Sequence, residues 1–320
     1  MKQLSAVLTV ILAMSLAGCG LMKATGVMKD PPPNTVVSLD VSGAKSFRDS
    51  DTLVVPTAYL RLTVDGKAAA VSDSNAFSTD TSNARVTLKY KINGVDKALA
   101  QEISKAAYED FVAKLRAAGY KVLTYDDIKD QISDLTRYSK DEAYDLPVDA
   151  GQLVVTPTDE MAIKPGMGGN IVAPYQRFGK SKLKEGTLII PTFTITSPLA
   201  KAETSGSTAN LQLFPSMALT AGSVAFMTHG GGWGSAKLKK VVFGLSENVG
   251  TIVKTADTSP SVANALTKTF AILGGVGGTN RKSAAYTMTV DRAAYRDAAV
   301  KGLTQFNDEL AKVAADAKKS

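Results

Sequence analysis

The sequence predicts an α+β protein in which long helices pack on mixed or antiparallel sheets, arranged in two lobes. Three observations lead to this class. Apolar residues recur at helical spacing over residues 95–118 and again over residues 295–310. The rest of the chain contains many short runs rich in β-branched and aromatic residues, separated by turn residues. Helical and strand signals of this kind on one chain indicate helices packed on sheets.

Two long helices are predicted. The apolar stripe of the first consists of Val95, Leu99, Ile103, Ala107, Phe111 and Leu115. Gly119 follows it and supplies the left-handed residue that ends many helices. The second helix begins after Asp291, a good N-cap, and its stripe consists of Tyr295, Ala299, Leu303, Phe306 and Leu310.

Strands are predicted wherever β-branched and aromatic residues cluster. The predicted strands are 52–64, 85–92, 120–124, 187–196, 210–219, 223–228, 236–243, 251–255 and 286–290. The first contains a proline, which indicates an edge strand or a bent one. Short helices are expected from residue 125 and over residues 261–273. A strand followed by a long helix occurs twice, at 85–118 and 286–317, so two similar units are conceivable.

The chain divides into four parts. Residues 1–18 are a signal peptide and residues 19–50 an extended tether, in which consecutive prolines favour a semi-rigid path. Residues 51–186 form an N-terminal α/β lobe, whose end is rich in proline and glycine and therefore in loops. Residues 187–320 form a strand-rich lobe closed by the C-terminal helix.

The first residues carry a targeting signal. Lys2 precedes an apolar run from Leu4 to Leu16, which is too short to span a bilayer comfortably. Leu16-Ala17-Gly18-Cys19 then resembles the lipobox of bacterial lipoproteins. The resemblance implies cleavage before Cys19, a diacylglycerol on its thiol, and usually a further acyl chain such as palmitate on its amino group. Two or more chains hold a protein on its membrane almost permanently.

The resemblance also implies a location, the periplasmic face of the cell outer membrane. Gly20 stands where an Asp retains many lipoproteins in the inner membrane of enterobacteria. The formal charge of +7 comes from 37 basic and 30 acidic residues spread along the chain. It favours weak attraction to anionic head groups, and nucleic acid is not a natural partner in the periplasm. Lys237, Lys239 and Lys240 form the densest cluster, which a solvated strand face explains.

Few residues are candidates for a site. His229 is the only histidine and Cys19 the only cysteine, so an internal disulfide is excluded, and no metal or other cofactor is expected. His229 lies in a Gly-rich segment ending in Trp233, which reads as a turn between two strands. An indole beside glycines is rarely wholly buried, so Trp233 is the best candidate for contact with a lipid, a glycan or a protein.

Other catalytic patterns are incomplete. Ser42 and Lys45 have Ser-x-x-Lys spacing without the other motifs of penicillin-recognising enzymes, and residues 274–282 lack a phosphate-loop order. The aspartates from Asp126 to Asp134 lack the glycine and glutamate of a calcium loop. Carboxylates distant in sequence could still converge in the fold.

These observations favour a non-enzymatic lipoprotein that binds or scaffolds other components of an envelope assembly. The order of elements around residues 85–128 is similar to that of curli-secretion-type and flagellar-ring accessory lipoproteins. The expected partners of this chain are the membrane, through the acyl chains on Cys19, and an envelope protein. Assembly into a homo-oligomer is left as an open alternative. Two alternatives remain: an oligomeric pore or secretion component that inserts the stretch 209–243, and a carboxylate-dependent glycan or cell-wall hydrolase.

Overall fold

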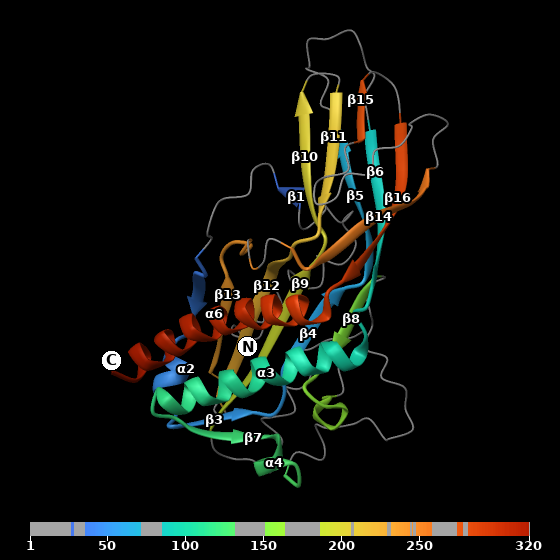
Figure 1. The fold of residues 1–320 in the computed structure, drawn as a ribbon. Coiled ribbons are helices and arrows are strands. Elements are labelled where there is room, and N and C mark those ends of the chain that lie inside the picture. Colours follow the sequence, from blue (N-terminus) through green and yellow to red (C-terminus); the bar gives the residue numbers. More distant parts are fainter. Residues whose placement is uncertain are drawn as a thin grey trace, which may run out of the picture.

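The structure is a computed structural model, and it confirms the α+β class with mixed sheets and long packing helices. It describes residues 27–28, 36–71, 85–131, 151–163, 186–205, 208–228, 232–243, 245, 248–257, 274–277 and 281–319. Residues 1–18, expected as a signal peptide, Cys19 and most of the expected tether lie outside the described residues. Figure 1 shows a large sheet covered by two long helices, with a second group of strands standing upright beside it.

The large sheet has eight strands, which run in the order β2-β13-β12-β9-β3-β7, with β4 and β8 continuing it beside β9. These strands are β2 (Leu39–Ser42), β3 (Thr52–Val55), β4 (Tyr59–Thr63), β7 (Lys121–Thr124), β8 (Gln152–Val155), β9 (Thr187–Thr196), β12 (Ala218–Thr228) and β13 (Trp233–Leu238). Both β3 and β4 lie parallel to β9, and the strand is interrupted between them, beginning at Pro56. The strand predicted over 52–64 is therefore bent and lies inside the sheet.

The upright strands form two four-stranded sheets packed face to face. One has the order β1 (Val27–Met28), β10 (Leu199–Ser205), β11 (Thr208–Phe214) and β15 (Gly274–Gly277). The other has the order β14 (Gly250–Asp257), β16 (Arg281–Val290), β6 (Arg85–Asn93) and β5 (Asp65–Val71). Small side chains such as Ala68, Ala70, Ala200 and Ala209 fill the space between the sheets. We call these two sheets the sandwich.

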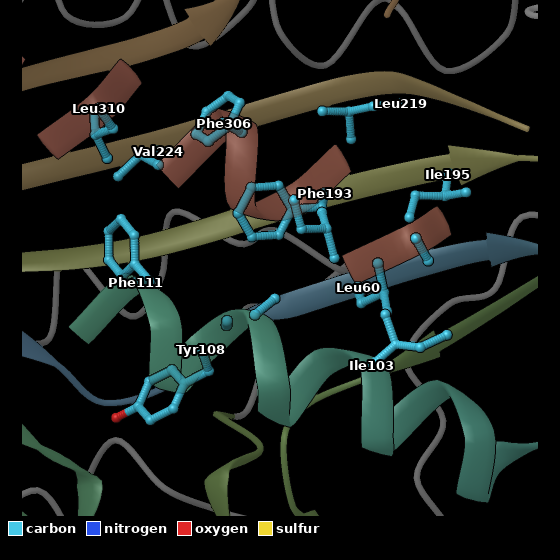
Figure 2. Close-up of a cluster of buried hydrophobic side chains, with 14 of the residues drawn as sticks. Leu60, Ile103, Tyr108, Phe111, Phe193, Ile195, Leu219, Val224, Phe306 and Leu310 are labelled. Carbon is cyan, nitrogen blue, oxygen red and sulfur yellow. The ribbon is translucent and has the colours of Figure 1, made fainter. Parts of the chain in front are cut away.

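Two long helices cover one face of the large sheet (Figure 1). They are α3 (Lys97–Ala117) and α6 (Arg292–Lys319), and the shorter α2 (Lys45–Arg48), α4 (Tyr125–Ile128) and the 3-10 turn η2 (Asp159–Met161) complete the described helices. Figure 2 shows Phe111 of α3 and Phe306 of α6 meeting Phe193 and Val224 of the sheet. The rings of Phe193 and Phe306 lie 5.2 Å apart, edge to face.

The two long helices belong to two similar units. β6 and β16 are parallel neighbours, from Arg85 opposite Arg281 onward, and each leads into one of the helices. Asp96 accepts a hydrogen bond from the amide of Leu99, and Asp291 accepts one from the amide of Ala294, so each carboxylate caps its helix. The strand-helix pattern seen twice in the sequence therefore corresponds to two adjacent strand-helix units.

Several sequence expectations differ from the structure. The stretch 210–219 was expected as one strand, but it is divided at Pro215 between β11 in the sandwich and β12 in the large sheet. The tether was expected to reach residue 50, but β2 and α2 already belong to the fold. The boundary expected at residue 186 does not separate two sheets, because parallel pairing of β3 with β9 and of β6 with β16 joins the two halves of the chain.

Candidate contact surface around Trp233

Trp233 opens the second strand of a hairpin. β12 and β13 are antiparallel, and Trp233 stands opposite Met227. The hydroxyl of Thr228 accepts a hydrogen bond from the amide of Gly232 at 2.8 Å, and the amide of Thr228 donates to the carbonyl of Gly232 at 2.8 Å. The Gly-rich segment thus joins two strands, as its composition predicts. His229, the other candidate contact residue, lies outside the described residues.

The backbone of Trp233 is held in place by close contact with β2 and its neighbour Gly43. Gly43 has φ +68°, and a Cβ there would lie 2.5 Å from the carbonyl oxygen of Trp233. A Cβ on Gly234 would lie 2.0 Å from the ring of Phe226 and 2.6 Å from the carbonyl oxygen of Ser42. Only glycine fits at either position without displacing backbone. The strand that carries Trp233 is consequently fixed on both sides, while the indole remains 43% exposed.

The face that carries Trp233 is the one turned away from the helices. Alternation along β13 places Trp233, Ser235 and Lys237 on it, because Gly234 and Ala236 are buried on the opposite face. That opposite face is covered by the helices, which together with the side chains beneath them we call the helical layer. Ser42 of β2 approaches Ser235, with 3.2 Å between the two hydroxyl oxygens. We call the set Ser42, Met227, Trp233, Ser235 and Lys237 the Trp233 surface.

This surface combines an indole, a thioether, hydroxyl groups and one cation, Lys237, whose cross-strand partner on β2 is Asp40. Such a combination stacks on sugar rings or packs on apolar side chains, while the hydroxyls form hydrogen bonds at the rim. Trp is enriched among the residues that dominate binding energy at protein interfaces. The chemistry of the Trp233 surface is therefore that of contact and recognition.

The most strongly shifted tyrosines lie elsewhere, in the core. Burial, with a smaller contribution from Asp65, raises the pKa of Tyr90 to about 12. Burial also raises the pKa of Tyr108, whose hydroxyl donates to the carbonyl of Val55 at 2.7 Å, and of Tyr295, which is fully buried. These shifts reflect desolvation by packing, which is the largest cause at each of the three tyrosines.

Within the described ranges, no group of three or more His, Cys, Asp or Glu side chains is arranged to hold a metal ion. One of the aspartates near residue 126, Asp127, has a structural role at the start of the short helix expected there. Asp127 accepts hydrogen bonds from the amide and the hydroxyl of Thr124, at 2.8 and 2.7 Å, and caps α4. These bonds hold the pKa of Asp127 below its usual value.

The sequence pointed to Trp233 as a contact residue and to Lys237 as part of a lysine cluster, but it did not group the other residues of the Trp233 surface with them. Ser42 was considered only as part of a Ser-x-x-Lys pattern, and the structure places it on β2, beside Ser235. The alternation in Leu39-Asp40-Val41-Ser42 was the available signal for that strand. Its pairing with β13 spans nearly two hundred residues of sequence, and local patterns do not reveal such a contact.

Comparison with protein-family models and with curated protein sequences finds no match for this chain. Among the helices that the structure describes, none is both long and apolar enough to cross a membrane.

Proposed function

We propose that this protein is a lipoprotein, anchored on the periplasmic face of the outer membrane, that binds an envelope component through the Trp233 surface. The lipobox ending at Cys19 supports the anchor. The tether between Cys19 and the fold leaves the body free to reach a partner near the membrane. In this proposal the protein acts by location and contact.

One observation carries the binding part of the proposal: a large aromatic side chain is exposed on a rigid strand. Trp233 is 43% exposed, although its strand lies between the buried Phe226 on one side and β2 on the other. A preorganised aromatic residue loses little conformational entropy on binding. It can therefore contribute strongly to affinity at a small interface.

The anchor is tested by Cys19→Ser. Cells that express this variant and the unchanged protein are labelled with radioactive palmitate and then separated into membrane and soluble fractions. We expect labelling of the unchanged protein only. Palmitate on the Cys19→Ser variant would show that the acyl chain is attached elsewhere and would refute the anchor.

The contact is tested by photo-crosslinking in cells. A photoreactive amino acid at Ser235, inside the Trp233 surface, is expected to give a discrete crosslinked product that Trp233→Ala abolishes. The same amino acid at Lys301, on the exposed side of α6, is the matched control and should not give that product. A product that survives Trp233→Ala, or that appears equally from Lys301, would refute binding at this surface. A product of twice the chain mass would identify a second copy as the partner.

A further inference from the structure

The outer face of the β5-β6 pair carries a cluster of four cations. Alternation turns Arg85, Lys89 and Lys91 of β6 and Lys67 of β5 outward, and all four side chains are exposed. The residues between them on the same strands, such as Ala68 and Leu88, are buried in the sandwich. We call Lys67, Arg85, Lys89 and Lys91 the lysine face.

The pairing of the strands places two of these cations directly against each other. Lys67 and Lys89 are cross-strand partners. Like charges at directly opposite positions destabilise a sheet. Among the outward positions of β5 and β6 there is one acid, Asp65, which is the cross-strand partner of Lys91. None of the ion pairs between described residues includes a member of the lysine face.

The surroundings of the lysine face are partly apolar. Val71 and Val253 of the same sheet are 44% and 53% exposed, and they belong to the few large aliphatic side chains exposed in the described part of the chain. Val253 stands opposite Thr287, which stands opposite Lys91, so the valine lies on the same outer face. A sheet face with lysines flanked by exposed valines can lie along a surface that is charged outside and apolar beneath.

The tether enters the fold at the sandwich. Val27 of β1 pairs with Ala200 of β10, and β10 packs against β5. Val27 follows Cys19 by only eight residues, which span at most about 29 Å when extended. Packed sheets are about 10 Å apart. Acyl chains on Cys19 would therefore hold the sandwich, and with it the lysine face, within reach of the membrane surface.

We propose that the lysine face docks on anionic lipid head groups of the membrane that holds Cys19. This inference rests on the proposed lipid anchor. The lysine ammonium groups donate hydrogen bonds to head-group phosphates, which relieves the repulsion between Lys67 and Lys89, while Val71 and Val253 meet the boundary of the acyl region. Docking fixes the orientation of the body, so that the tether no longer allows every orientation relative to the membrane.

The test uses a unique thiol on the acylated protein. Because Cys19 is the only cysteine, Val253→Cys adds the only free thiol once Cys19 is acylated. The acylated variant is reconstituted in phosphatidylcholine vesicles with or without phosphatidylglycerol, and its reaction with a large maleimide polymer is timed. We expect the reaction to slow by fivefold or more when phosphatidylglycerol is present, and to recover at high salt. Equal rates in both kinds of vesicle would overturn the inference.

Charge variants decide whether the lysine face is the cause. Adding Lys67→Gln, Lys89→Gln and Lys91→Gln to Val253→Cys should abolish the slowing, since each lysine near an anionic surface contributes roughly fivefold to the affinity. The matched control Lys105→Gln, Lys121→Gln and Lys301→Gln removes the same amount of charge elsewhere, and its reaction with the maleimide polymer should still be slowed by phosphatidylglycerol. Slowing that persists in the first triple variant, or equal slowing by soluble heparin with neutral vesicles, would overturn docking on the membrane.

Failure of the anchor has a different signature. If Cys19 is not acylated, the unchanged protein itself reacts with the maleimide polymer through Cys19, which refutes the lipoprotein proposal. The lysine face is then tested by co-sedimentation of this unacylated protein with the same vesicles. Binding that depends on phosphatidylglycerol and on the three lysines would uphold docking, and its absence would overturn it.

Discussion

Between α3 and α6, cations form ion pairs with carboxylates, whereas on the lysine face cations lie next to other cations. Lys114 of α3 contacts Asp308 of α6 at 2.7 Å, and Arg292 contacts Asp96 at 2.7 Å. On the lysine face, Lys67 stands opposite Lys89, and neither takes part in an ion pair between described residues. The chain therefore neutralises charge where two elements must pack and leaves charge in excess on a face turned outward. In our proposals, the first region contributes to stability and the second docks on a membrane.

The two regions also differ in what their cores contain. Beneath the helices lie large rings and branched side chains, including Phe193 and Phe306. Inside the sandwich lie mostly alanine and leucine. Larger side chains remove more apolar area from water and contribute more to the free energy of unfolding. We accordingly expect the most damaging substitutions in the helical layer.

The largest effect is expected for Phe306→Ala. Phe306 is fully buried, and it packs over Gly222, where a Cβ would lie 2.7 Å from the ring. The substitution should lower the free energy of unfolding by about 3–5 kcal/mol. Urea denaturation followed by circular dichroism measures this. The control Val253→Ala, on the outer face of the sandwich, should change the free energy by less than about 0.5 kcal/mol. Similar effects of the two variants would refute the difference between the regions.

Asn307→Ala should have the next largest effect. Asn307 is fully buried on α6, and its amide donates to the carbonyl of Ala107 at 3.0 Å and to Asp110 at 2.8 Å. Loss of these bonds should cost about 1–3 kcal/mol in the same denaturation assay. Asn307→Leu keeps a similar volume without the amide. If it is as stable as the unchanged protein, then packing, and not the polar contact, holds the helices together.

The long helices of the helical layer were the easiest elements to predict from sequence. The stripe of the first long helix, its stop at Gly119 and the cap at Asp291 follow from local spacing and local chemistry, and the structure contains all three. The pairing of β6 with β16 was not predictable, because strands that lie about two hundred residues apart carry no local record of their partner. The lysine face was missed for another reason: residues 65–71 were not predicted as a strand, and Lys67 becomes the neighbour of Lys89 only when β5 pairs with β6.

Asp96 links stability in the helical layer to pH. Hydrogen bonds from the guanidinium of Arg292 and the amide of Leu99 hold the pKa of Asp96 below its usual value. Because the folded-state pKa is the lower one, the stabilisation is complete above the unfolded value of about 3.9 and is lost as the pH falls through the folded value. Asp96→Ala should cost about 1 kcal/mol near neutral pH.

The control for this prediction is Asp96→Asn, which keeps an N-capping oxygen and removes the titrating group. Thermal denaturation between about pH 5 and pH 2 should show a smaller loss of stability with Asp96→Asn than with the unchanged protein. The same acid-dependent loss in both would mean that the Asp96 contact with Arg292 does not contribute to stability.

The smallest change in the free energy of unfolding is expected on the lysine face. Whether the variant is more or less stable than the unchanged protein is what tests the proposal. Lys67→Glu replaces repulsion from Lys89 by attraction, so it should raise the free energy of unfolding by about 0.2–1 kcal/mol at low salt. Lys67→Gln only removes the repulsion and should give a smaller gain, and both gains should shrink as salt screens the charges. Urea denaturation at two ionic strengths measures both. A variant that is more stable yet docks less well on anionic vesicles would show that Lys67 reduces stability and serves binding. A destabilised Lys67→Glu variant would mean that the two lysines are not in conflict, and the comparison with the helical layer would lose its physical basis.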